Sequence, residues 1–226
     1  MTIKKANSIT LDVTDRCQLR CETCLKWKTN AQEVMSKELS TDQWKRILDD
    51  VRNWCGEGTH FIFSGGEPFL RNDLLELIGY AKSIGLNPHS MSNAFSIEPL
   101  LEQIVQSGLI TINFSLNSIK NPSIHDKSRG VSGSYDKVIA VITKLKEIIK
   151  QKNAALKINI STIMFPENLD EIIPLVEFVK EHELSGISIQ LVEDINSFHG
   201  YNEIRSVESL DYLMPSQLKE IYNQIG

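Results

Sequence analysis

Three of the four cysteines in this chain stand within eight residues, in the spacing C-x3-C-x2-C: Cys17, Cys21 and Cys24. Thiols clustered in this way are more typical of a metal site than of disulfide bonds, which join distant parts of a chain. Three thiolates are one fewer than a closed structural zinc site or a fully ligated [4Fe-4S] cluster uses. The spacing therefore favours a [4Fe-4S] cluster with one iron left open to a further ligand.

Zinc is the alternative for the same loop, with the fourth ligand supplied by Cys55 or by a histidine. The paired ligands usual in zinc modules are missing, because the histidines stand singly along the chain: His60, His89, His125, His182 and His199. Cys55 also falls on the apolar stripe of a predicted helix, where a core position is expected. An iron–sulfur cluster is therefore the favoured interpretation, and zinc stays open.

A second candidate motif, Gly65-Gly66-Glu67-Pro68, stands between a predicted strand and a predicted helix. Two glycines permit positive φ angles and let the backbone approach a ligand closely. The Glu67 carboxylate would accept hydrogen bonds from an amine. The alternative is a tight turn whose acid is favoured by the dipole of the helix that follows. Beside a cysteine loop, the ligand-binding interpretation is the stronger one.

The elements that must position these motifs alternate regularly along the chain. Short apolar segments predict strands at residues 8–13, 60–64, 86–91, 109–116, 156–163 and 186–192. Amphipathic helices are expected between them, opened by Ser40, Asn72, Ser96, Ser134 and Asn168. Ser40 and Gln43 have the spacing of a capping box. Pro174 predicts a kink or a late start in the fifth helix, and residues 216–225 predict a last one.

This alternation predicts an α/β fold with parallel strands, since each helix returns the chain to the same edge of the sheet. Six units suit a partial (βα)6 barrel of the TIM type, because a complete barrel takes about 250 residues. A doubly wound sheet is the alternative, which periodicity alone does not exclude. We expect a core domain at residues 1–200 and a C-terminal helical extension at residues 201–226.

Polar residues follow the predicted strands at the point where each strand ends. In parallel α/β folds these exits share one edge, and functional groups gather there. The cysteine loop follows the first strand, and Glu67 follows the second. The other exits supply Ser92, Asn93, Ser115, Asn117, Ser161, Thr162, Gln190, Glu193 and Asp194. Their convergence predicts one functional site at this edge.

The 226 residues include 24 basic and 29 acidic side chains, a formal charge of −5. This balance argues against a nucleic-acid surface as the main function. The N-terminus lacks the apolar region of a signal peptide and no apolar run has the length of a transmembrane helix, so we expect no membrane partner and a cytoplasmic location. Arg16, Arg20, Lys26 and Lys28 surround the cysteine loop, either as a docking surface for an acidic protein or as an ordinary solvated loop.

Together, the cysteine loop after the first strand and the Gly-Gly-Glu-Pro turn after the second closely resemble the radical S-adenosylmethionine (SAM) superfamily. The resemblance extends from about Ser8 to Val192. The residues around the motifs, and those from Arg129 to Tyr135, look most like the branch of molybdenum-cofactor biosynthesis enzymes, haem-modifying enzymes, and peptide and sulfatase maturases. Relatives in that branch commonly continue into a cysteine-rich domain, whereas this chain ends at Gly226 and has only Cys55 outside the loop.

The resemblance implies particular residues for each part of the cofactor site. Cys17, Cys21 and Cys24 would hold a [4Fe-4S] cluster whose open iron is chelated by SAM. Gly65, Gly66 and Glu67 would bind the amine of SAM, and Ser115 and Arg129 its carboxylate. Ser92, Asn93 and Asn117 would hydrogen-bond the ribose, and Ile163 and Leu191 would flank the adenine.

The resemblance also implies a function. One electron from the reduced cluster would cleave SAM to methionine and a 5′-deoxyadenosyl radical, which abstracts hydrogen from a peptide or small-metabolite substrate. The electron donor would be of the flavodoxin or ferredoxin type. No residue stands out as a catalytic partner of the substrate. A non-catalytic or partner-dependent iron–sulfur and SAM-binding scaffold is the alternative, but a mere electron carrier has no use for the amino-acid clamp of Gly65, Gly66, Glu67 and Arg129.

Overall fold

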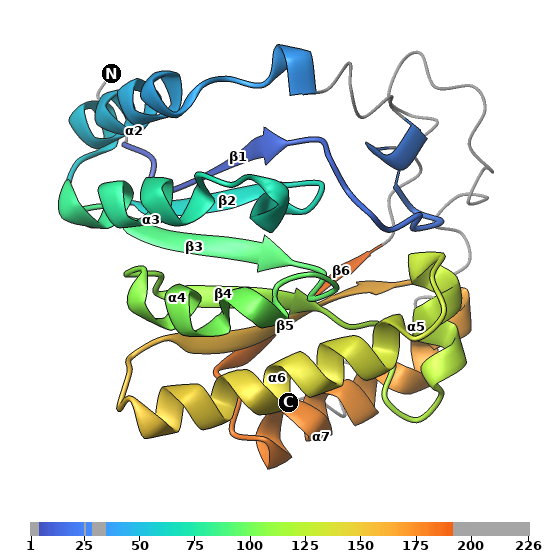
Figure 1. The fold of residues 1–226 in the computed structure, drawn as a ribbon. Coiled ribbons are helices and arrows are strands. Elements are labelled where there is room, and N and C mark those ends of the chain that lie inside the picture. The colour runs from blue at the N-terminus through green and yellow to red at the C-terminus, as the bar shows by residue number, and fades with distance from the viewer. Residues whose placement is uncertain (1–4, 25, 29–34, 192–226) are drawn as a thin grey trace.

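Six parallel strands lie side by side in chain order in the computed structural model, which describes residues 5–24, 26–28 and 35–191. They are β1 (Ser8–Thr14), β2 (His60–Gly65), β3 (Asn87–Ser92), β4 (Thr111–Ser115), β5 (Lys157–Met164) and β6 (Gly186–Leu191). Every neighbouring pair is parallel. This order confirms the predicted partial barrel and excludes a doubly wound sheet, in which the strand order reverses. Figure 1 shows the strands following one another from blue β1 to orange β6.

Helices return the chain across the sheet after each of the first five strands, as the alternation predicted. The α-helices are α2 (Thr41–Cys55), α3 (Leu74–Ser83), α4 (Leu101–Gln106), α5 (Pro122–Arg129), α6 (Ser134–Gln151) and α7 (Ile172–Glu181). Short 3-10 turns are η1 (Lys26–Lys28), η2 (Pro68–Leu70), η3 (Glu98–Leu100) and η4 (Pro166–Glu171). Figure 1 shows α2, α3, α4 and α6 in front of the sheet.

The two faces of the sheet have different environments. On the helix-covered face, Phe61, Phe63, Phe114 and Ile160 have no exposed surface and belong to one hydrophobic core. The alternate side chains, such as Ile62, point to the opposite, concave face and are only partly buried. The apolar core therefore lies between sheet and helices, which leaves the concave face free to carry polar groups.

The helix starts agree with the sequence in some places and differ in others. The capping box of Ser40 and Gln43 is present at α2. Ser134 is the first residue of α6, and α7 starts late, at Ile172, so that Pro174 lies in its first turn, where no backbone donor is needed. The starts at Asn72 and Ser96 are wrong, because Asp73 precedes α3 and Ile97 precedes η3, neither with a side-chain cap.

Helix α5 is an element that the periodicity of the sequence missed. It is short, and its mean character is polar, so no apolar stripe announces it. Its start does carry a signal: Asn121 accepts a hydrogen bond from the Ser123 amide, and Pro122 occupies the first turn.

Several expectations concern residues outside the described ones. These are the extension at 201–226, its helix at 216–225, and the acidic pair Glu193 and Asp194. Within the described ranges, none of the helices has the length and apolar character needed to span a bilayer.

Candidate functional site

The cysteine loop follows β1 and is held in place by the C-terminal end of α5. The Arg20 amide donates to the Arg129 carbonyl and the Glu22 amide donates to the Ser128 carbonyl, both at 3.1 Å. Gly130 then approaches the loop so closely that a Cβ there would lie 2.2 Å from the Arg20 carbonyl oxygen. The unpaired carbonyls of a helix terminus thus fix the backbone of the loop.

The Gly-Gly turn packs directly on the exit of β1. The Gly66 amide donates to the Thr14 carbonyl and the Glu67 amide to the Arg16 carbonyl, both at 2.8 Å. A Cβ on Gly65 would lie 2.1 Å from the Thr14 carbonyl oxygen, and one on Gly66 would lie 2.2 Å from that of Arg16. The close approach expected of these glycines is therefore, in this structure, an approach to the chain's own backbone.

Glu67 is completely buried and bridges the exits of β2 and β3. Its carboxylate accepts hydrogen bonds from the Asn93 amide at 2.7 Å, the Ser92 hydroxyl at 3.1 Å and the Phe69 amide at 3.3 Å. Burial raises the pKa of Glu67 to about 7, against these hydrogen bonds and the positive charge of Arg129. A carboxyl group beside the cysteine loop is thus poised between its neutral and ionised forms at neutral pH.

Asn93 connects the exit of β3 to the cysteine loop. Its side-chain nitrogen lies 3.6 Å from the Cys17 sulfur, a hydrogen-bonding distance for sulfur. Its side-chain oxygen accepts from the Phe95 amide at 2.9 Å and from Nε2 of Gln18 at 3.2 Å. Ser92 and Asn93 therefore both have partners within the chain, and their contact with a ribose stays a prediction.

Asn117 braces β4 against its neighbours. Its side-chain nitrogen donates to the Ser128 hydroxyl at 2.9 Å, and its side-chain oxygen accepts from the Ile163 amide at 3.2 Å. Its own amide donates to Nδ1 of His125 at 3.1 Å. Burial and the nearby Arg129 charge lower the pKa of His125 to about 3, so the imidazole stays neutral and able to accept. A ribose contact of Asn117 is likewise a prediction, because these bonds already occupy its side chain.

Arg129 ends α5, and its buried side chain is near enough to Cys17, Cys21 and Glu67 for its charge to act on them. Its positive charge lowers the pKa of Cys17, of Cys21 and of Glu67, although burial raises the pKa of all three. Its Nε atom is buried and has no hydrogen-bond partner in the described part of the chain. A buried cationic donor without a partner suits an external anion such as a carboxylate.

Ser115, the other residue expected at that carboxylate, is half-buried at the end of β4, in register with Ser161.

The three loop cysteines are free and partly buried, whereas Cys55 is buried in the core, as predicted. Cys55 ends α2 just before β2 and so lies towards the opposite edge of the sheet from the cysteine loop. Among the described residues, no three Cys, His, Asp or Glu side chains are arranged around a single metal ion. A [4Fe-4S] cluster attaches each thiolate to a different iron, so its ligands need not converge on one point.

Two of the basic residues near the loop are neutralised inside the chain. Arg16 pairs with Glu38 at 3.0 Å, and Lys26 pairs with Asp12 at 2.7 Å and also with Asp15. Their side chains therefore position the loop, and of the four basic residues Arg20 remains exposed on the loop surface. The side chain of Lys28 lies outside the described residues.

Trp27 anchors the loop by donating from Nε1 to the Cys21 carbonyl at 3.0 Å.

The pair expected to flank an adenine lies at the ends of the last two strands. Ile163 is in register with Gln190, and Leu191 is 41% exposed. The pattern of the sequence did not single out Glu38, His125 or Ser128, because their contacts with Arg16 and Asn117 depend on the folded arrangement of the chain and not on a local spacing.

A comparison with known families places most of the chain in one model, "Radical SAM superfamily", which matches residues 11–179. A "PqqA peptide cyclase" of Bradyrhizobium diazoefficiens is 27% identical over 189 residues, which are 82% of this chain and 46% of that protein. An "AdoMet-dependent heme synthase" of Methanosarcina barkeri is 30% identical over 174 residues, 76% of this chain and 47% of that one.

Solved structures share the fold at lower sequence identity. SuiB of Streptococcus suis, in its complex with S-adenosylmethionine, superposes with a TM-score of 0.77 at 19% identity, over 98% of this chain and 47% of that one. The chain thus spans about half the length of these curated relatives and of this structural neighbour.

Proposed function

Because the chain belongs to the radical SAM superfamily, we propose that it holds a [4Fe-4S] cluster on Cys17, Cys21 and Cys24 and that it cleaves S-adenosylmethionine reductively. When bound, such a cluster supplies the single electron that cleaves SAM to methionine and a 5′-deoxyadenosyl radical. The observation that carries the proposal is the buried guanidinium of Arg129, whose charge acts on Cys21 and Glu67 and whose Nε has no hydrogen-bond partner among the described residues.

Contacts from α5 and an ion pair hold the cysteine loop in place. Arg129 and Ser128 fix the loop backbone through their carbonyls, and Arg16 fixes its start through Glu38. Burial raises the pKa of Cys17, against a hydrogen bond from the Leu19 backbone and the weaker effect of the Arg129 charge. The thiolate form needed for iron binding would therefore be favoured mainly by the metal itself.

Arg129 would receive the carboxylate of SAM, with Ser115 as a second donor. Glu67, Gly65 and Gly66 would receive the amine, because they border the cysteine loop and Glu67 has a pKa of about 7. An ammonium group beside Glu67 would favour its ionised form, so the amine and the carboxylate of Glu67 would stabilise each other. Ribose contacts by Ser92, Asn93 and Asn117 and adenine packing on Ile163 and Leu191 complete the proposed site.

We propose a peptide as the substrate. The support is that PqqA peptide cyclases are among the relatives and that SuiB was also solved with its precursor peptide SuiA. A small metabolite is the second candidate, favoured by the similarity to a heme synthase and to a "GTP 3',8-cyclase". The electron donor would be a flavodoxin- or ferredoxin-type protein, for which exposed Arg20 offers one positive charge beside the loop.

The decisive experiment measures 5′-deoxyadenosine after anaerobic reconstitution with iron and sulfide, reduction by dithionite and addition of SAM. The wild-type chain is expected to form it above the background without protein. Cys17→Ala should lose both the brown colour and this activity, whereas the matched control Cys55→Ala should keep both, since Cys55 is a core residue. A brown chain that forms no 5′-deoxyadenosine would support the scaffold alternative instead.

A further inference from the structure

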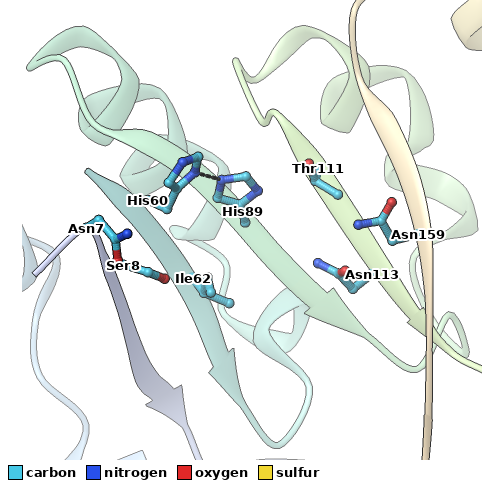
Figure 2. A pocket seen from close by; sticks show the side chains of 8 residues that line it. All are labelled: Asn7, Ser8, His60, Ile62, His89, Thr111, Asn113 and Asn159. Atoms are coloured by element: carbon cyan, nitrogen blue, oxygen red, sulfur yellow. Dashed lines mark hydrogen bonds between the residues drawn. The ribbon is translucent and has the colours of Figure 1, made fainter. Parts of the chain in front are cut away.

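A cavity of about 290 Å³ opens on the concave face at the opposite end of the strands from the cysteine loop. Its lining comes from Asn7 and the start of β1 and from the first half of β2, β3, β4 and β5, whereas the cysteines, Glu67 and Arg129 follow strand ends. The residues that matter chemically are His60, His89, Ile62, Thr111, Asn113 and Asn159 (Figure 2).

Two histidines form one wall of the cavity. Nδ1 of His60 lies 2.7 Å from Nε2 of His89, so a single proton is shared between these two nitrogens. Whichever ring carries that proton, the outer nitrogens of the neutral pair present one donor and one acceptor. Burial and the neighbouring His60 lower the pKa of His89 to about 4, so that ring stays neutral near neutral pH.

Two asparagines line the cavity on the next two strands of the sheet. Asn113 and Asn159 are in register on β4 and β5 and both line the cavity. The Asn113 nitrogen donates to the Ser90 carbonyl at 3.4 Å. The Asn159 side-chain oxygen is buried with no hydrogen-bond partner in the described part of the chain. A buried polar atom without a partner costs about 1–3 kcal/mol, so a ligand that supplied the missing hydrogen bond would recover that cost.

The lining is polar but has no Asp, Glu, Lys or Arg among the described residues. Lys157 is next to Thr111 in the sheet register but does not line the cavity. A charged ligand would lose its hydration here without gaining an opposite charge. Amides, hydroxyls and the two imidazoles instead complement a neutral group that both donates and accepts.

We propose that this cavity binds a small neutral molecule or side chain through a carboxamide or lactam group, paired with the amide of Asn159. Such a group donates its N–H to the orphaned oxygen and accepts from the asparagine nitrogen. The ring or chain that bears it packs on Ile62 and the two imidazoles. This site uses none of the cysteines, so it stands independently of the proposed SAM chemistry.

The test compares three probes of one shape and different charge: benzamide, benzoate and benzamidine. Saturation-transfer NMR on the full chain near neutral pH should show saturable binding of benzamide and at least about tenfold weaker binding of the two ions. The same result is expected with Cys17→Ala, which removes a proposed cluster ligand. Equal binding of benzoate and benzamide, or no saturable binding of benzamide, would overturn the proposal.

Variants at Asn159 test whether benzamide binds in this cavity. Asn159→Leu should weaken benzamide about tenfold or more, whereas Asn53→Leu, the same change on the exposed face of α2, should leave it unchanged. Asn159→Asp keeps the shape but supplies a negative charge, so it should reverse the preference from benzamide to benzamidine. Circular dichroism checks that each variant is folded. Benzamide binding that survives both changes at Asn159 would show that the amide does not carry recognition.

Discussion

The side-chain nitrogen of Asn93 lies 3.6 Å from the sulfur of Cys17, so the exit of β3 donates a hydrogen bond to the first cysteine of the loop. The backbone amide of the same residue donates to Glu67 at 2.7 Å. One residue thus connects the two motifs that the sequence presents 41 positions or more apart, Cys17 to Cys24 and Gly65 to Glu67. Its two bonds are separable, because only the first uses the side chain.

Replacing Asn93 should change the reduction potential of the proposed cluster. A hydrogen bond to a ligating sulfur stabilises the more negative, reduced state, so its loss in Asn93→Leu should lower the potential, by roughly 40 mV for a bond of about 1 kcal/mol. Asn93→Asp, which places a carboxylate near the sulfur, should lower it further. A titration followed by electron paramagnetic resonance measures this, with Asn53→Leu as the control. An unchanged potential at equal cluster content would contradict the prediction.

Arg129→Met should weaken SAM binding by the reconstituted chain. Loss of a charge-assisted hydrogen bond costs about 1.5–3 kcal/mol, or at least about a tenfold rise in Kd. Arg20→Met changes an exposed arginine on the cysteine loop and should leave the Kd unaltered. Equilibrium dialysis with labelled SAM gives both values. Equal Kd values for the two variants would remove Arg129 from the proposed clamp.

The folded chain without a cluster should lose stability as the pH rises through the pKa of Glu67. Its folded-state pKa of about 7 is above the ordinary 4.5, so the folded form binds a proton more tightly, and the free energy of unfolding falls between these values. The full effect is about 3 kcal/mol, present below pH 4.5 and lost above about pH 7. Glu67→Gln, which does not titrate, should lack this fall. Urea denaturation at several pH values compares the two chains.

Gly66→Ala should disrupt the site for lack of space. The added Cβ would lie 2.2 Å from the Arg16 carbonyl oxygen, so the turn and the cysteine loop must move apart, at a cost of about 3 kcal/mol or more. Gly79→Ala is the matched control. Gly79 lies inside α3, and an added Cβ there would meet only the Ser107 carbonyl oxygen, at 3.7 Å. It should stabilise the chain by up to about 1 kcal/mol through helix propensity. Chemical denaturation checks both signs.

Local patterns explain which features the sequence could predict. The spacing of Cys17, Cys21 and Cys24, the capping box of Ser40 and Gln43, and the alternation of strands with helices are each contained in short stretches. The order of strands follows from that alternation, because short crossovers place consecutive parallel strands side by side. The edge on which the motifs meet was therefore predictable without coordinates.

Contacts between distant segments depend on register, burial and side-chain direction, which no short stretch contains. The structure alone assigns the Glu67 carboxylate to Ser92 and Asn93, and the Asn117 amide to Ser128 and Ile163. It also pairs Arg16 with Glu38. From the sequence alone, Arg16 was a candidate for a docking surface.

The sequence by itself thus determined which ligand types are present and how they are spaced, since these and the glycines are local properties. Only the tertiary structure decided which polar atoms already have a hydrogen-bond partner within the chain and which do not. Among the described residues, the Arg129 Nε and the Asn159 side-chain oxygen have no hydrogen-bond partner, and His60 on β2 meets His89 on β3 in the cavity that Asn159 also lines. The reason is physical: whether a polar atom has a partner depends on what packing brings within about 3 Å of it.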